Sequence, residues 1–171
     1  MTRRWLSQPD TSYEPLQGAY PDAVLDEHPS GEFVAMQVTV ALDVLQERAA
    51  VWNTKTRELV WKAEDLNAIC WSSRGDEVYV VRQSYHRSVD HPARIVTPLQ
   101  SEVSYFFQRH SWPGRQLTAC SSIRPPTGWI VDVAVSPIGD LACFSWNDQT
   151  EARVELVSIV GNEVPQRPGQ G

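Results

Sequence analysis

The segment from Tyr85 to Arg94 holds the densest group of side chains that could do chemistry in this chain. It contains imidazoles at His86 and His91 and a carboxylate at Asp90. Such groups can ligate zinc or another metal, but a third strong ligand is not evident and the spacing matches no known site. A solvated loop has the same composition. We interpret the segment as a recognition loop, because long insertions on rigid sheet scaffolds often carry binding residues.

Two tryptophans are further candidates for contact with a partner. Trp112 lies in the turn-like segment His110–Arg115, where Trp and Arg could form a protruding hot spot; we favour a turn whose tryptophan packs back on its sheet. Trp5 is an isolated aromatic in a polar arm, which could anchor that arm to a sheet or to a partner. The candidate partner-binding residues are Trp5, Tyr85, His86, Arg87, Asp90, His91, Arg94 and Trp112.

No catalytic constellation is found in the sequence. There is no Gly-x-Ser-x-Gly elbow, and the 9 glycines are dispersed at turns rather than clustered before a helix. Tyr105-Phe106-Phe107 could stack on nucleotides, but it is better read as a strand interior. We therefore expect a protein that is not an enzyme and that needs no metal or cofactor.

Composition narrows the class of partner. The chain has 171 residues and a formal net charge of −6, and its 15 Lys and Arg are scattered. Nucleic-acid binding usually needs a basic face, so we expect none. The first nine residues lack the apolar stretch of a signal peptide, and no run is long enough to span a bilayer. An odd number of cysteines (Cys70, Cys120, Cys143) fits a reducing compartment. We expect a soluble, cytoplasmic protein without a membrane partner.

A turn recurs three times between short apolar runs. The three copies are His28–Glu32, Ser72–Asp76 and Ser136–Asp140, each with glycine in the fourth position and an acidic residue in the fifth. Glycine supplies the positive φ that a tight turn needs. A recurring turn of this kind marks a structural repeat. A second turn follows the first copy at Asn53–Thr56 and the second copy at Pro113–Gly114.

The segments between the turns have the character of strands. Glu77–Val81 is rich in β-branched and aromatic residues, Trp129–Val135 has apolar residues at period two, and Leu141–Trp146 is apolar on both faces. Leu42–Ala50 contains good helix formers, but the repeat favours a strand end, a turn and a new strand. The second repeat is longer than the others, and the extra length falls in Tyr85–Gln100 as a loop insertion.

The domain limits follow from composition. Residues 1–21 are polar and interrupted by prolines, so we expect an irregular arm. Residues 22–162 form a single repeat-type β domain, and residues 163–171 form a flexible tail.

The repeat resembles the Trp-Asp (WD) repeat of β-propellers. Trp52-Asn53, in Ala50–Trp61, stands where that family has Trp-Asp at the end of the third strand. Leu66–Val80 resembles the first strand, turn and second strand of the next repeat, and Trp129–Phe144 repeats this pattern. The family's Gly-His dipeptide is absent, and Leu156–Ile159 replaces the third Trp-Asp. The resemblance implies an all-β fold of stacked antiparallel four-stranded sheets, a partial propeller of about three blades. A β-sandwich or barrel is the alternative.

Three blades are too few to close a propeller, which typically has about four to eight. The third is also incomplete, because Pro165 makes residues 163–165 a poor fourth strand. The arm could add a strand, two chains could assemble, or the chain could dock on a partner. Uncapped blade faces expose apolar surface. We therefore expect association with a protein partner or with itself through the first and last blades.

The expected function is that of a non-catalytic interaction module: a scaffold, adaptor or complex subunit. The resemblance implies this role, because most members of the Trp-Asp repeat family are scaffolds that bind other proteins. One alternative is an immunity or antitoxin-like protein that masks a basic partner surface. Another is a ligand-binding or enzymatic propeller that uses the loop at residues 85–100.

Overall fold

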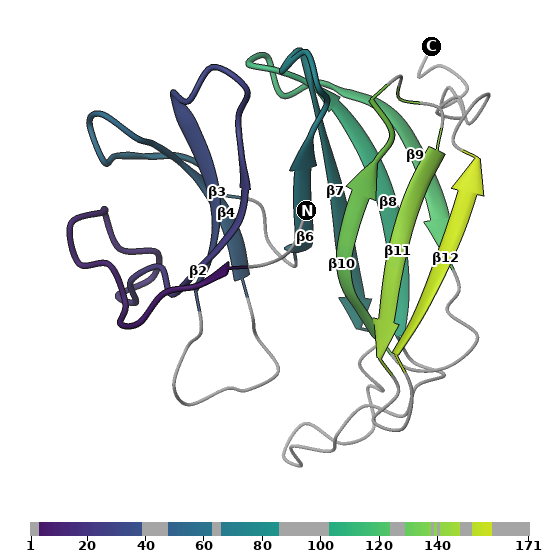
Figure 1. Ribbon diagram of the computed structural model, residues 1–171, viewed down its shortest axis with the longest axis horizontal. Helices are drawn as coiled ribbons and strands as arrows, with labels where there is room; N and C mark the ends of the chain where they lie inside the picture. Colours follow the sequence, from purple (N-terminus) through teal and green to yellow (C-terminus); the bar gives the residue numbers. More distant parts are fainter. Residues whose placement is uncertain are drawn as a thin grey trace, which may run out of the picture.

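The computed structural model describes residues 4–38, 48–62, 66–85, 103–123, 129–137, 139, 141–147 and 152–158. All regular structure in this part of the chain is β-strand (Figure 1). The strands are β1 (Arg4–Trp5), β2 (Ala23–Glu27), β3 (Phe33–Val38), β4 (Arg48–Asn53), β5 (Leu59–Lys62), β6 (Leu66–Trp71), β7 (Glu77–Tyr85), β8 (Val103–Ser111), β9 (Leu117–Ile123), β10 (Trp129–Val135), β11 (Leu141–Asn147) and β12 (Ala152–Ser158).

These strands form three antiparallel sheets in which each strand pairs with its neighbour in sequence. The orders are β1-β2-β3-β4-β5, β6-β7-β8-β9 and β10-β11-β12. We call them the first, second and third sheets. They stack face to face, and β6 lies against both β2 and β10 (Figure 1). The fold is therefore a partial, propeller-like stack of three blades, as the sequence predicts. The four-stranded blade is seen in the second sheet, while β1 enlarges the first and three described strands make up the third.

The three predicted turns are built alike. In each, the glycine N–H donates to the carbonyl three residues earlier: Gly31 to His28 at 2.8 Å, Gly75 to Ser72 at 3.0 Å and Gly139 to Ser136 at 2.9 Å. The glycines have φ values of 70°, 76° and 73°. This is the left-handed region, which costs a residue with a Cβ free energy. The structure thus confirms why glycine recurs in this position.

The second turn also repeats. In the β4–β5 turn, Arg57 N–H donates to Asn53 O at 3.0 Å, and in the β8–β9 turn Arg115 N–H donates to Ser111 O at 2.7 Å. Both arginines have positive φ, 64° and 57°. The Asn53 side chain accepts N–H groups from Lys55 and Thr56 at 2.8 and 3.0 Å. Trp52-Asn53 therefore ends the third blade strand and opens the turn.

The recurring turns also fasten neighbouring sheets together. The His28 Nε2–H of the first turn donates to Gly75 O of the second at 2.9 Å, while Nδ1 accepts the Ser30 N–H at 3.1 Å. Ser73 of the second turn donates its hydroxyl to Pro137 O of the third at 2.8 Å. One rim of the stack is therefore held by side-chain bonds from each turn to the next.

Two predicted segments lie partly outside the described residues. In Leu42–Ala50, the last three residues belong to β4, in agreement with a strand, and residues 42–47 lie outside the described residues. The expected insertion lies between β7 and β8, which pair directly up to Tyr85 and Val103. Residues 86–102 also lie outside the described part.

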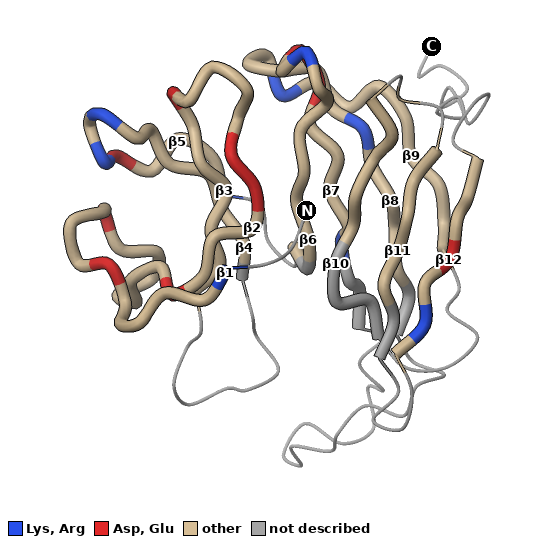
Figure 2. Tube along the Cα trace, in the orientation of Figure 1, with Lys and Arg blue, Asp and Glu red and all other residues tan. Residues whose placement is uncertain are grey.

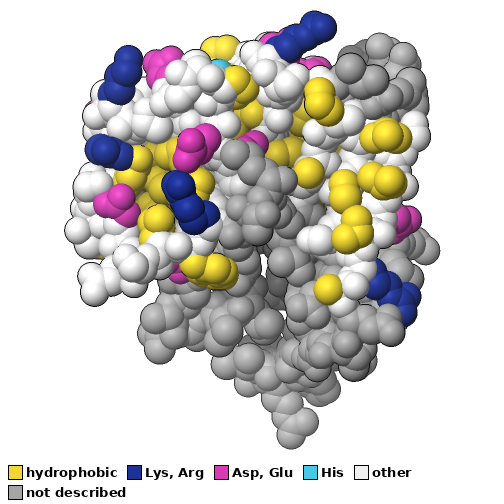
Figure 3. Space-filling view, viewed as in Figure 1, with side chains coloured by type: hydrophobic (Ala, Val, Ile, Leu, Met, Phe, Trp, Pro, Cys, Tyr) yellow, Lys and Arg dark blue, Asp and Glu magenta, His cyan; other side chains and the backbone are white. Residues whose placement is uncertain are grey.

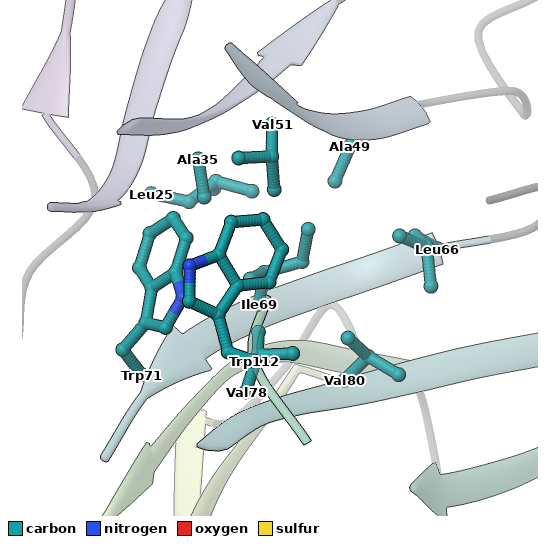
Figure 4. Close-up of a cluster of buried hydrophobic side chains, with 10 residues drawn as sticks. All are labelled: Leu25, Ala35, Ala49, Val51, Leu66, Ile69, Trp71, Val78, Val80 and Trp112. Atoms are coloured by element: carbon teal, nitrogen blue, oxygen red, sulfur yellow. The ribbon is translucent and has the colours of Figure 1, made fainter. Parts of the chain in front are cut away.

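Apolar clusters fill the spaces between the layers. The first and second sheets enclose ten buried side chains (Figure 4): Leu25, Ala35, Ala49, Val51, Leu66, Ile69, Trp71, Val78, Val80 and Trp112. The second and third sheets enclose another group, which includes Tyr79, Phe107 and Phe144. A third cluster lies on the outer side of the first sheet. Burial of these faces is the main force that holds the stack together.

Candidate functional site: the two end faces of the stack

The N-terminal arm covers the outer face of the first sheet. Tyr13 and Leu16, 8% and 4% exposed, pack with Val34, Met36 and Trp52 of that face. β1 adds a strand beside β2, with Arg4 opposite Val24 and Trp5 opposite Ala23. The arm thus occupies the place that a preceding blade would take.

Polar contacts fix the arm in this position. The indole N–H of Trp52 donates to Glu14 O at 2.8 Å, and the Leu59 N–H donates to the Glu14 carboxylate at 2.7 Å. The Arg57 guanidinium lies 4.5 Å from the centre of the Tyr13 ring and donates to its hydroxyl. Burial, hydrogen bonds and a cation–π contact therefore act together at this end.

The outer face of the third sheet has the opposite character. Val154 and Leu156 on β12 are 71% and 70% exposed, and Leu141 on β11 is 40% exposed. The register places Leu156 opposite Cys143 and Val154 opposite Ser145, so these side chains share one face. Hydrophobic side chains gather over β10, β11 and β12 on the right of Figure 3. We call Leu141, Cys143, Val154 and Leu156 the outer patch.

The repeat shows what the outer patch corresponds to. Ala35 and Cys143 both stand four residues after the turn glycine, and they pair with Val51 and Leu156. Six residues after the glycine, Gln37 pairs with Ala49 and Ser145 pairs with Val154. Val51 and Ala49 are buried against the second sheet. Leu156 and Val154 therefore occupy the positions that contact the following layer, and no such layer lies among the described residues.

β12 also ends the third sheet at its edge. It pairs with β11 on one side, and no described strand pairs with its other side. Six of its seven residues are exposed. Acidic and basic residues stand close together on this strand (Figure 2), with Arg153 and Glu155 on either side of Val154.

A small pocket lies at the other end of the molecule, between the arm and the first sheet. It has a volume of about 230 Å³, and Arg4 and Glu27 at its wall form an ion pair at 3.3 Å. Asp10, also in the wall, accepts the hydroxyl and the N–H of Ser12 at 2.6 and 3.0 Å, and these bonds lower the pKa of its carboxyl. Arg4, Glu27 and Asp10 in the pocket wall thus each have a polar partner.

The buried carboxyl of Asp26 joins two sheets. It accepts the Trp71 N–H at 2.8 Å and the Glu27 N–H at 2.9 Å. Burial raises the pKa of this carboxyl despite both bonds. Because both oxygens are held by main-chain donors, this group links β2 to β6 within the core.

Of the residues predicted to bind a partner, the structure describes the side chains of Trp5 and Trp112. Trp5 lies on β1 with 57% of its surface exposed. Tyr85 ends β7, and its side chain is outside the described part of the chain. His86, Arg87, Asp90, His91 and Arg94 also lie outside the described residues.

Trp112 is placed in the core between the first and second sheets. It is 8% exposed, and its ring centre lies 5.1 Å from that of Phe33 and 5.7 Å from that of Trp71. Its main-chain N–H donates to Asp76 O at 2.8 Å. A ring so enclosed offers little surface to a partner. The packing interpretation of the β8–β9 turn therefore describes Trp112 better than a protruding hot spot does.

No three His, Cys, Asp or Glu side chains within the described part of the chain lie close enough together to hold a metal ion. None of its segments is a helix with the length and apolarity needed to cross a membrane.

Comparisons with known proteins show similarity of fold only. No protein family matches the sequence, and no curated protein matches it. Hydrazine synthase of Kuenenia stuttgartiensis has a similar structure, with a TM-score of 0.52 and 9% identity over 79% of this chain and 39% of that chain. The Dos1 propeller matches with a TM-score of 0.48 and 10% identity over 81% and 32% of the two chains. TolB from Acinetobacter baumannii matches at 0.47 and 11% over 81% and 30%. The chain thus spans less than half of each.

Sequence reasoning did not single out the outer patch. The alternation in Arg153–Val157 would by itself place Val154 and Leu156 inside. The register instead puts the neighbouring Val157 opposite Ala142, in the cluster between the second and third sheets. A shift of one residue reverses every side chain of a strand, so only the pairing reveals the patch.

Proposed function

We propose that this chain is a non-catalytic protein-interaction module that binds another protein on the outer patch of the third sheet. The observation that carries the proposal is the difference between the two end faces. The first sheet is capped by the chain's own arm through Tyr13 and Leu16, while Val154 and Leu156 at the other end are 71% and 70% exposed.

The repeat indicates what kind of surface fits there. Stacked repeats bury a continuous core only when each layer meets another, and their terminal layers need a polar outer face or a cap. The side chains equivalent to the patch, Ala49 and Val51, meet the apolar face of an antiparallel sheet. We therefore expect the partner to present an antiparallel β-sheet with an apolar face, in the place of a fourth blade.

The module is proposed to be of a degenerate Trp-Asp type. Trp52 is fully buried at the end of the third blade strand, and the Asn53 amide oxygen closes the next turn, where that family has its dipeptide. Scaffold and adaptor roles are common in the family and fit a chain with an uncapped apolar face. The proposed location is the cytoplasm, because Cys70, Cys120 and Cys143 are free cysteines and thiols stay reduced in that compartment.

The test begins with site-specific photo-crosslinking. A photoreactive residue replaces Leu141, at the patch, or Leu117 on β9, a leucine of similar exposure (44% against 40%) outside it. We expect a crosslink to another polypeptide at position 141 and a much weaker one at position 117. Equal crosslinking at the two positions would show that the contact is unspecific.

The crosslinked protein is then purified and titrated against variants of the chain. We expect Leu141→Asp to weaken binding at least tenfold, because it buries a charge in an apolar contact, and Leu117→Asp to leave binding unchanged. If Leu141→Asp binds as tightly as the unaltered chain, the outer patch is not the binding surface.

A further inference from the structure

The edge of β12 that pairs with no described strand is complementary to itself. Its sequence is Ala152, Arg153, Val154, Glu155, Leu156, Val157 and Ser158, with a basic and an acidic residue on either side of Val154. Edge strands carry main-chain N–H and C=O groups that can pair with a strand of another chain. The strand is exposed along nearly its whole length, and its unpaired side is free of other described strands.

We propose that two copies of this chain associate by antiparallel pairing of β12 with β12 about a two-fold axis at Val154. In this register Val154 lies opposite Val154 of the second copy. Arg153 lies opposite Glu155 of the second copy, and by symmetry Glu155 lies opposite its Arg153. Ala152 and Leu156 also face each other twice. Opposite charges and apolar side chains placed directly across a strand pair stabilise it, and like charges destabilise it.

Neighbouring registers lack this complementarity. An axis at Glu155 places the two Glu155 carboxylates opposite each other, which costs free energy. An axis at Leu156 places Glu155 opposite Val157, which leaves the acidic group without a basic partner. Registers centred between residues would pair residues from opposite faces of the two sheets, so the apolar faces would not align. Within the described strand Ala152–Ser158, the axis at Val154 is the one that yields two ion pairs.

The pairing joins the two third sheets into one six-stranded sheet. Because the axis is perpendicular to the sheet, the outer patches of both copies lie on the same side and form one larger apolar surface. This inference rests on the proposed function in treating the third sheet as the end at which the chain associates. It adds that a second copy occupies the edge, while the partner occupies the face.

Charge reversal combined with sedimentation equilibrium tests the ion pairs. We expect a dimer whose dissociation constant rises at least tenfold in Glu155→Arg and in Arg153→Glu, because each places like charges opposite each other twice. The double variant Arg153→Glu/Glu155→Arg restores the pairs in reversed order, so its dissociation constant returns to within about threefold. Glu58→Arg, the same change at an exposed site in the β4–β5 turn, leaves dimerisation unchanged. A monomeric chain, or a double variant as weak as the single ones, overturns the proposal.

Cysteine crosslinking tests the register without altering charge. Cys120 and Cys143 are first replaced by serine; Cys70 is buried and stays. Opposed residues in an antiparallel pair have Cα atoms about 4.5–5.5 Å apart, within the range of roughly 4.4–6.8 Å for a disulfide. Val154→Cys is expected to crosslink on mild oxidation. Leu156→Cys alone is not, because the two positions lie about 13 Å apart at roughly 3.3 Å per residue. Adding Ala152→Cys to Leu156→Cys restores the crosslink. Crosslinking by Leu156→Cys alone, or none by Val154→Cys, overturns the register.

The two proposals fail in different ways. A monomeric chain that still binds the purified partner through Leu141 removes the dimer and leaves the interaction module. A dimer with the predicted register that shows no patch-dependent partner supports the pairing and removes the proposed function.

Discussion

Replacing a leucine by alanine is predicted to lower the free energy of unfolding by very different amounts at the two ends of the stack. Leu16 under the arm is 4% exposed and Leu156 on the outer patch is 70% exposed. Truncation of a buried leucine to alanine costs about 2–5 kcal/mol, because apolar transfer and cavity terms add. Leu16→Ala should lie near the lower half of that range, about 2–3 kcal/mol, since a surface arm can collapse onto the gap. Leu156→Ala removes only the buried three tenths of a side chain, so we expect less than about 1 kcal/mol.

The assay is urea unfolding followed by tryptophan fluorescence, which reports on the seven tryptophans of the chain. Both substitutions are made in Glu155→Arg, so that dimerisation does not contribute. With a urea slope of roughly 2 kcal/mol per molar, Leu16→Ala lowers the midpoint by about 1–1.5 M. Leu156→Ala lowers it by less than about 0.5 M. Equal shifts in the two variants would refute the reasoning, because they would mean that the third sheet is covered in solution as the first sheet is.

Two further predictions concern the contacts between the sheets. Gly31→Ala should lower the free energy of unfolding by about 1–2 kcal/mol because of the positive φ at this position. Gly75→Ala should cost roughly 1–3 kcal/mol more from overpacking, because a Cβ at Gly75 would lie 2.4 Å from His28 Nε2, while none of the surrounding atoms comes within 4 Å at Gly31. Urea unfolding of both variants checks this order, and equal costs would exclude a tight contact between the turns. Because the pKa of Asp26 is raised from 3.8 on folding, the folded protein binds the proton of this carboxyl more tightly than the unfolded chain does. The protonated carboxyl therefore makes its full contribution to the free energy of unfolding below pH 3.8, and that contribution is lost as pH rises through the folded pKa. Relative to Asp26→Asn, the free energy of unfolding should therefore fall as pH rises across that window, by up to about 1.4 kcal/mol per pH unit; parallel pH profiles of the two proteins would contradict the burial of this carboxyl.

The architecture was largely predictable from local sequence. The turn glycines Gly31, Gly75 and Gly139 need positive φ, a property of the residue itself, and it recurs at φ values of 70–76°. Strands such as β7 and β11 follow from β-branched and apolar composition. The structure agrees with these predictions because turn glycines and strand composition act locally and do not depend on residues far away in the sequence.

The end faces could not be predicted in the same way. Residues 1–21 contain prolines and few apolar residues, and nothing local shows that Tyr13 and Leu16 pack on Trp52. The exposure of Val154 and Leu156 depends on the register with β11, which a pattern within β12 does not determine. The burial of Trp112 likewise depends on Phe33 and Trp71 from other strands.

The central claim is that the outer patch is the uncovered apolar face of the stack, and binding of a hydrophobic dye tests it most directly. The dye is added to the Glu155→Arg variant, and we expect its fluorescence to rise as it binds. Most of this rise should be lost when Leu141→Asp and Leu156→Asp are added to the same variant. It should persist when Leu117→Asp, at an exposed leucine of the second sheet, is added instead. A dye signal that is absent from the start, or that falls equally with Leu117→Asp, would contradict the account.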